Sequence, residues 1–435
     1  MRRLPWSLAA VLCLAAQTAA AQTYRPDRPY RGLFAPPNPD AHHQLDVSWS
    51  AATAYDGNIT VDSGLASSPA TAVDGGWGSA ELTGKYEYRG RHATFHASVF
   101  GRDRYYPKFE KLSAVDHGAD VGFTTNVTGT TRISASQALI YQPFYQLSLV
   151  TNVASLEPSP GLDPIDSLSK TQSRSYSGAT EISQRLGAAS AVVLGYGYRY
   201  TQLPGTGAAP FQSQSITGTF TRTLTRRVSL RLGSGTGRTE GGLNLTSSPA
   251  DTTLPGRRVT TRNLEVGLDY ARPLSRSRHT TYSFASGAGT VTDLGVSAYR
   301  VMFDGGVTRE LGRAWTTGAT YHRGLAFIDG IAAPSYADAA HVRLGGLISK
   351  RYDVNLAAAY SKGQIGLVQD QGGFTTYSGT ADFRIALTRG LSIVVGYTSY
   401  RYTFAEDVAV TSGLEQARHR QSVRIGLSGW LPIVR

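Results

Sequence analysis

Large apolar side chains alternate with small or polar ones along most of this chain. In the segment AVVLGYGYRYTQ, every second position holds an apolar or aromatic residue: Val192, Leu194, Tyr196, Tyr198 and Tyr200. Glycine, arginine and threonine stand among the residues between them. Successive side chains of a β-strand point to opposite faces of the sheet, so this repeat predicts strands with one apolar face.

Eighteen segments of the chain follow this alternation. They are 45–55, 77–88, 92–102, 116–127, 131–141, 174–186, 189–201, 212–224, 227–239, 259–272, 277–289, 296–309, 314–326, 338–349, 352–363, 374–387, 390–404 and 415–430. Short and long connections alternate strictly between them. This alternation is typical of an antiparallel barrel with tight turns on one rim and loops on the other. The sequence therefore predicts an all-β fold, an up-and-down β-barrel of about 18 strands, with sixteen as the alternative count.

The residues on the two faces of these segments predict what each face contacts. A soluble β-sandwich also alternates, but its polar face is rich in lysine and glutamate, whereas here that face carries small residues and isolated charges. Tyrosines such as Tyr88, Tyr270 and Tyr377 lie near the ends of the apolar stripes, where transmembrane barrels place aromatic girdles. Because hydrocarbon offers no hydrogen-bond partner, a sheet in lipid must close on itself. We therefore expect a transmembrane antiparallel barrel.

The N-terminus has the pattern of a secretion signal. A basic start, an apolar run LAAVLCLAA and small residues before Gln22 predict a cleaved signal peptide over 1–21. The single cysteine, Cys13, leaves with that segment. Residues 22–43 are proline-rich and predict an extended periplasmic arm, and residues 44–435 form the expected barrel domain.

Over residues 45–430 the chain resembles Gram-negative outer-membrane β-barrels of the porin-like type. The stretch Tyr55–Ile59, YDGNI, resembles the Tyr-Asp-x-Asn-Ile/Val motif of β-barrel porins associated with exopolysaccharide systems. The resemblance implies a place in the outer membrane, contact with outer-membrane lipid and insertion by the barrel-assembly machinery. One departure is that such barrels usually end in an aromatic residue, whereas this chain ends WLPIVR after Trp430.

Charged residues fall on the face opposite the apolar stripes and are the expected lining of the lumen. They include the basic residues Arg102, Arg199, Arg231, Arg300, Arg343 and Arg384, and the acidic residues Glu81, Asp120, Glu265, Asp269, Asp304 and Asp382. Two interpretations stay open. Walls of opposite sign would orient polar solutes, whereas pairs of opposite charge on adjacent strands would only hold the wall together.

The longest connection, 142–173, is a candidate constriction. It carries acidic residues together with apolar ones that have no reason to face water. General porins fold their third outer loop into the pore, and by that resemblance Glu157, Asp163 and Asp166 would face lumen arginines. The alternatives are a lid over the mouth and an extension of the fifth strand above the membrane.

A barrel of about 16–18 strands leaves an aqueous channel, which favours passive diffusion of small hydrophilic solutes or saccharides. The alternative is an accessory barrel of an exopolysaccharide export or surface system, with a blocked lumen. No nucleophile with its base is recognisable, and GSGTG at 233–237 lies inside an expected strand rather than before a helix. We therefore expect no enzyme activity, no catalytic residue, no cofactor and no metal. The net charge of +12 is scattered, so nucleic acid is not an expected partner.

Overall fold

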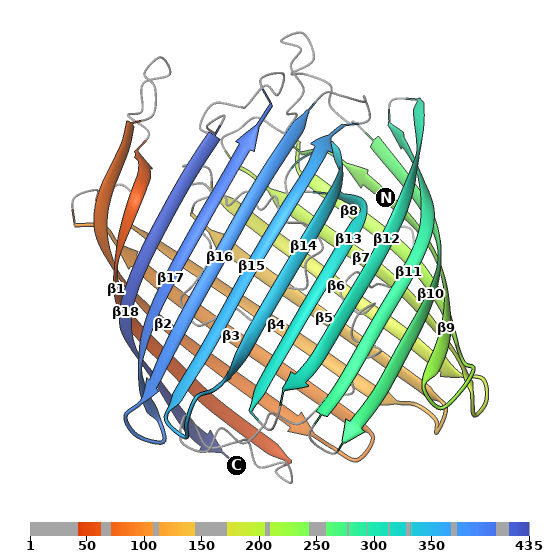
Figure 1. The fold of residues 1–435 in the computed structure, drawn as a ribbon, viewed down its shortest axis with the longest axis horizontal. Helices are drawn as coiled ribbons and strands as arrows, with labels where there is room; N and C mark the ends of the chain where they lie inside the picture. Colours follow the sequence, from red (N-terminus) through yellow and green to blue (C-terminus); the bar gives the residue numbers. More distant parts are fainter. Residues whose placement is uncertain are drawn as a thin grey trace, which may run out of the picture.

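One continuous antiparallel sheet accounts for almost all of the described structure. The computed structural model describes residues 42–61, 71–107, 113–143, 172–204, 209–242, 258–275, 278–293, 295–311, 314–327, 331, 333–366, 372–405 and 417–434. Within these residues the chain forms a sheet of 18 strands that closes into a barrel (Figure 1). The predicted signal peptide and nearly all of the predicted arm lie outside the described residues.

The strands follow one another along the chain. They are β1 (His43–Val61), β2 (Thr71–Arg89), β3 (Ala93–Tyr105), β4 (Ala114–Asn126), β5 (Thr131–Gln142), β6 (Ser173–Arg185), β7 (Ser190–Gln202), β8 (Phe211–Thr223), β9 (Val228–Glu240), β10 (Arg258–Ser275), β11 (Arg278–Asp293), β12 (Val296–Leu311), β13 (Trp315–Phe327), β14 (Pro334–Leu347), β15 (Tyr352–Ile365), β16 (Gly373–Ala386), β17 (Leu391–Phe404) and β18 (Ala417–Val434). No helix among the described residues is long and apolar enough to cross a membrane.

The barrel is closed by its first and last strands. Each strand pairs with its neighbours in sequence, and β1 pairs with β18 from Leu45 opposite Val434 to Gly57 opposite Gln421. This is the up-and-down barrel that the alternation predicts, and the strand count of eighteen is confirmed. The C-terminus lies on the rim of short turns, here called the turn rim, at the bottom of Figure 1. The opposite rim, where the longer connections lie, is the loop rim.

The strand boundaries differ from the prediction at the junction of β1, β2 and β18. β1 extends to Val61 and β2 begins at Thr71, both inside the expected loop 56–76, because β1 continues through a register shift between Asp56 and Ile59. Glycine and aspartate at these positions suggested a turn, but a bulge accommodates them inside a strand. β18 runs to Val434, beyond the predicted end at 430, with Pro432 opposite Asp46 where the β1–β18 register shifts.

The two faces of the sheet differ in polarity, as the alternation predicts. The outward column of β10 holds Leu264, Val266 and Leu268, which are 63%, 49% and 47% exposed, whereas the intervening Glu265 is 7% exposed. Outward aromatic rings pair across neighbouring strands, as in Tyr360 with Tyr377, whose ring centroids are 5.0 Å apart. So much exposed apolar surface on one face of a closed sheet is what a hydrocarbon surrounding stabilises.

We expect Val266→Arg to lower the free energy of unfolding by about 2–4 kcal/mol, because the substitution places a charge in the middle of the apolar outer face. Asn263→Arg, on the inward face of the same strand, is the matched control and should change the free energy of unfolding little. Urea titration of both variants in lipid vesicles measures the difference. Equal costs for the two variants would contradict the assignment of faces.

Candidate channel lumen

Charges on the inward face of β2, β3 and β4 meet across neighbouring strands. Glu81 stands opposite Arg102 in the β2–β3 register, and Arg102 Nε lies 3.0 Å from Glu81 Oε2. Two residues further along β3, nearer the loop rim, Arg104 Nη2 lies 2.5 Å from Asp116 Oδ2. All four side chains are largely buried. These ion pairs therefore brace the wall as well as line it.

A buried cluster of mixed chemistry lies where the barrel closes. Asp56, at the bulge of β1, is fully buried and accepts a 2.7 Å hydrogen bond from Trp77 Nε1 on β2. The guanidinium of Arg420 on β18 forms an ion pair with the same carboxylate. The Trp77 and Tyr106 rings pack with centroids 6.0 Å apart. The aspartate of YDGNI thus links the first, second and last strands, which gives this motif a structural role.

Further inward charges lie on β15, β16 and β18. Arg424 Nη2 is 3.9 Å from Asp382 Oδ1, and both side chains are buried. Arg384, two residues after Asp382, stands opposite Asp353 in the β15–β16 register. Basic and acidic side chains are therefore interleaved here, so this side of the lumen does not carry a single sign of charge.

The wall formed by β9 to β14 holds a second group of charges. Arg231 Nη2 lies 3.9 Å from Asp269 Oδ1, and His322 Nδ1 lies 2.6 Å from Asp304 Oδ1. Glu265 is buried against β9, where Gly233 leaves it room: a Cβ on Gly233 would lie 2.6 Å from Glu265 Cγ. The GSGTG stretch on β9 is therefore part of the barrel wall, as the sequence indicated.

The remaining expected lumen residues differ in their surroundings. Asp120 accepts a hydrogen bond from the Ser98 hydroxyl and lies 3.8 Å from His96 Nε2. Arg199 on β7 is exposed, and Arg343 lies beside Gly318 of β13. The guanidinium of Arg300 stacks on the Tyr336 ring, 5.4 Å from its centroid. Glu157, Asp163 and Asp166 lie outside the described residues.

The inward columns of β6 and β8 carry mostly hydroxyl groups, and Thr201 at the end of β7 adds one between them. We call this region the hydroxyl wall, and its members are Ser173, Ser175, Ser177, Thr201, Ser213, Ser215, Thr217, Thr219 and Thr221. Ser175 Oγ and Thr201 Oγ1 are 3.1 Å apart. Hydroxyls both donate and accept hydrogen bonds, so this wall suits water and polar uncharged groups. Among the described residues, no group of histidine, cysteine and carboxylate side chains is arranged to hold a metal ion.

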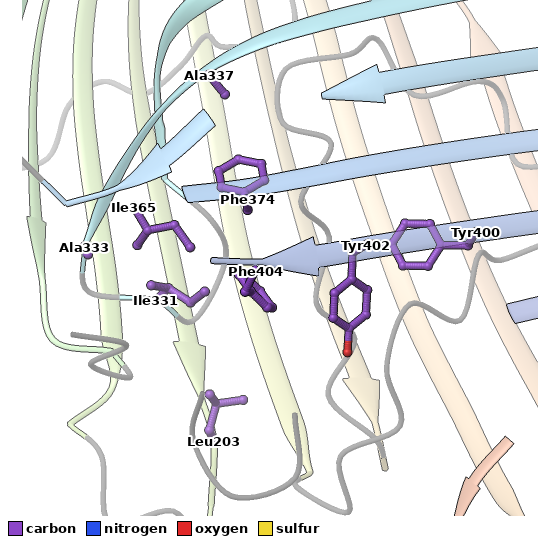
Figure 2. Close-up of a cluster of buried hydrophobic side chains, with 9 residues drawn as sticks. All are labelled: Leu203, Ile331, Ala333, Ala337, Ile365, Phe374, Tyr400, Tyr402 and Phe404. Carbon is purple, nitrogen blue, oxygen red and sulfur yellow. The ribbon is translucent and has the colours of Figure 1, made fainter. Parts of the chain in front are cut away.

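An apolar cluster at the loop rim was not predicted from the sequence. We call it the rim cluster, and it contains Leu203, Ile331, Ala333, Ala337, Ile365, Phe374, Tyr400, Tyr402 and Phe404. Figure 2 shows Phe374, Tyr402 and Phe404 from β16 and β17, with Ile331 beside them and Leu203 nearer the opposite wall. The available signal was the run YRYTF at the end of β17, which puts large aromatics at the inward positions.

Comparison with known proteins gives structural likenesses only. The fold is similar to Pseudomonas aeruginosa OpdQ and OccK2 (OpdF), with TM-scores of 0.45 and 0.46, each at 10% identity over 90% of this chain and 98% of the other. It is also similar to Acinetobacter baumannii OccAB3, with a TM-score of 0.47 at 10% identity over 90% of this chain and 99% of the other. No family model and no curated protein matches the chain. Likenesses at this level assign no solute and no residue role.

We expect Asp56→Asn to lower the free energy of unfolding by about 3–5 kcal/mol, because it leaves the buried Arg420 guanidinium without its counter-charge. The double variant Asp56→Asn/Arg420→Gln should cost less than the sum of the two single variants. Asp120→Asn, at a half-exposed carboxylate, serves as control and should cost about 1 kcal/mol or less. Urea titration measures the four variants against the wild type. Additive costs at Asp56 and Arg420 would show that the two residues are not energetically coupled.

Proposed function

We propose that this protein is an outer-membrane channel for the passive diffusion of small hydrophilic solutes, saccharides among them. The observation that carries the proposal is the closed 18-stranded sheet with an apolar outer face and an inner face of hydroxyls and charges. A barrel of this strand number is wide enough for water. Its wall contributes no catalytic group to the proposed function, because diffusion needs only a polar path.

The outer face supports a position in a lipid bilayer, with the loop rim outside the cell and the turn rim in the periplasm. Above the apolar column of β10, outward-facing Arg258 and Arg238 both bond Glu240, with Arg258 Nε 2.5 Å and Arg238 Nε 2.8 Å from Glu240 Oε1. These two guanidinium groups lie on the outer face towards the loop rim, where we place the phosphate headgroups of the outer leaflet. Outer-membrane lipid and the barrel-assembly machinery are the partners this arrangement requires.

Saccharides fit the lumen better than strongly charged solutes. Most inward charges already have a neighbouring opposite charge, as in Arg102 with Glu81 and Arg424 with Asp382. Such pairs exert only a weak field on a passing ion, yet they keep hydrogen-bonding capacity for neutral polar groups. The hydroxyl wall offers further donors and acceptors. Glu157, Asp163 and Asp166 remain our proposed constriction between these walls.

We expect discrete single-channel steps in the current when the mature protein is reconstituted into planar bilayers. Arg199→Glu should move the reversal potential in a KCl gradient towards cation selectivity, because Arg199 is exposed on the inward face. Arg222→Glu makes the same change on the outward face of β8 and should leave the reversal potential unmoved. Absence of conductance at every voltage would contradict the channel, and an equal shift for both variants would contradict the lumen assignment.

The rim cluster favours a second candidate function, an accessory barrel of an exopolysaccharide export or surface system whose lumen is obstructed. Nine apolar or aromatic side chains packed inside a polar lumen narrow its outer mouth. Hydrophobic constrictions in channels also resist wetting.

Shortening the third long loop separates the two candidates. Gln142 and Ser173 are register partners, so residues 143–172 can be replaced by Asn-Gly without disturbing the β5–β6 ladder. We expect an open channel to change its conductance modestly. The obstructed barrel would instead conduct only after the deletion, or only after Leu203→Ser/Ile331→Ser loosens the rim cluster. Planar-bilayer recordings of the three proteins decide between the candidates.

A further inference from the structure

The wall of the barrel has a gap in its hydrogen-bond ladder at the loop rim, between β12 and β13. These strands pair from Leu311 opposite Trp315 up to Phe303 opposite Arg323. Above that point β12 continues as Val296–Met302, paired with β11 only, and no ladder joins it to Gly324–Phe327 within the described residues. Continuing the register would place Val301 opposite Leu325. Figure 1 shows the β11–β12 hairpin rising at the right of the upper rim.

The end of β13 leaves this ladder because it leans into the lumen. Alternation along β13 would point Leu325 outward, yet its Cδ1 lies 3.5 Å from where a Cβ of Gly289 would be, and Met302 Sδ lies 3.1 Å from the same point. Gly289 and Met302 belong to the inward columns of β11 and β12. The following residues Ile331 and Ala333 join the rim cluster. The gap and the rim cluster thus arise from the same inward bend.

A side chain spans the gap in place of a strand. Tyr336 of β14 donates its hydroxyl hydrogen to the carbonyl oxygen of Val301 at 2.7 Å and accepts a 3.0 Å hydrogen bond from Arg323 Nε. The guanidinium groups of Arg300 and Arg323 lie 5.4 Å and 5.6 Å from the centroid of the Tyr336 ring. One tyrosine held by two cations therefore closes the gap, and a side-chain contact of this kind opens more readily than a ladder.

The outer surface below the gap is aromatic and apolar. The Phe303 ring lies 5.0 Å from that of Phe284 and 5.6 Å from that of Tyr321. Tyr299 and Val301, on the unpaired edge itself, are outward and well exposed. An alkyl chain fits this surface, while Arg300 and Arg323 supply positive charge at the gap. Asp338 Oδ1 lies 3.5 Å from Arg323 Nε and offsets one of these two charges. Unpaired backbone in a membrane is tolerated where it lines a wet opening.

We propose that the β12–β13 gap is a lateral port through the barrel wall, latched by Tyr336, through which single-chain amphiphiles with an anionic headgroup pass between lumen and outer leaflet. The proposal rests on the membrane position given under Proposed function. The carboxylate or phosphate of the amphiphile is held by Arg300 and Arg323, and its alkyl chain lies on Phe284, Phe303 and Tyr321. This route is separate from the axial path of hydrophilic solutes.

Photolabelling of the full mature chain in lipid vesicles with a diazirine-bearing dodecanoate tests the port. Adducts at Met302 or Gly289 report entry into the lumen, and adducts at Phe303 or Phe284 report binding to the outer face. The variant Val301→Cys/Leu325→Cys closes the gap when a bis-maleimide with a disulfide in its spacer joins the two thiols, because Leu325 leans inward and does not face Val301 as a direct disulfide requires. The intact spacer is called the seam disulfide, and Cys13 is the only native cysteine. The matched control variant is Val266→Cys/Ser286→Cys, which is crosslinked in the same way. These two residues are register partners in the continuous β10–β11 ladder.

We expect the inward adducts to disappear in the crosslinked seam variant, to return when the spacer disulfide is reduced, and to persist in the crosslinked control variant. Tyr336→Phe should increase them, and a diazirine-bearing dodecanol should give fewer. Inward adducts that survive the seam disulfide, or a wild-type protein labelled only on its outer face, would overturn the port. Equal inward labelling by dodecanoate and dodecanol would overturn the anionic class. Conductance recorded on the same preparations tests the axial channel separately, because the seam disulfide leaves that path open.

Discussion

The hydrogen-bonding demand of the backbone is the constraint on which this structure depends. A strand surrounded by hydrocarbon finds no partner for its N–H and C=O groups except a neighbouring strand. A sheet that satisfies every strand must therefore close, and β1 pairs with β18 to do so. Closure creates an inner space, and the side chains on the inward face of every strand must suit that space. Apolar side chains outside and hydroxyls or charges inside follow from this single requirement.

Charge inside the barrel is organised by pairing. A buried guanidinium or carboxylate is costly unless an opposite charge or several hydrogen bonds compensate it. Arg104 with Asp116 and Arg420 with Asp56 meet this requirement across adjacent or joining strands. The same pairs leave the wall polar but nearly neutral. Two interpretations of the inward charges were open, walls of opposite sign or pairs across adjacent strands. The residues that form short contacts are paired across adjacent strands.

Much of the architecture could be predicted from the sequence, because a repeat of two residues is local. The strand number, the antiparallel order and the face of residues such as Val266 and Glu265 all follow from it. Which charges meet could not be predicted, because pairing depends on the register between strands, and Asp56 and Arg420 are joined only by closure. A bulge at Asp56 cannot be told from a turn in the sequence, since glycine and aspartate favour both.

The inward bend of β13 could not be predicted from the sequence either. Its residues alternate normally, and only the packing of Leu325 near Gly289 and of Ile331 in the rim cluster reveals it. Such a bend exchanges ladder hydrogen bonds for apolar contacts inside the lumen. The result is a barrel with an apolar cluster inside its loop rim and a β12–β13 ladder that ends short of that rim.

The central claim is that hydrocarbon bathes one face of the strands and water the other. Single cysteines placed in turn along residues 258–270 of β10 test it most directly, since the sequence has no cysteine after Cys13. In lipid vesicles, a membrane-impermeant maleimide should label the odd positions and a bilayer-confined maleimide the even positions between 262 and 270. Labelling by either reagent without a period of two would contradict the claim.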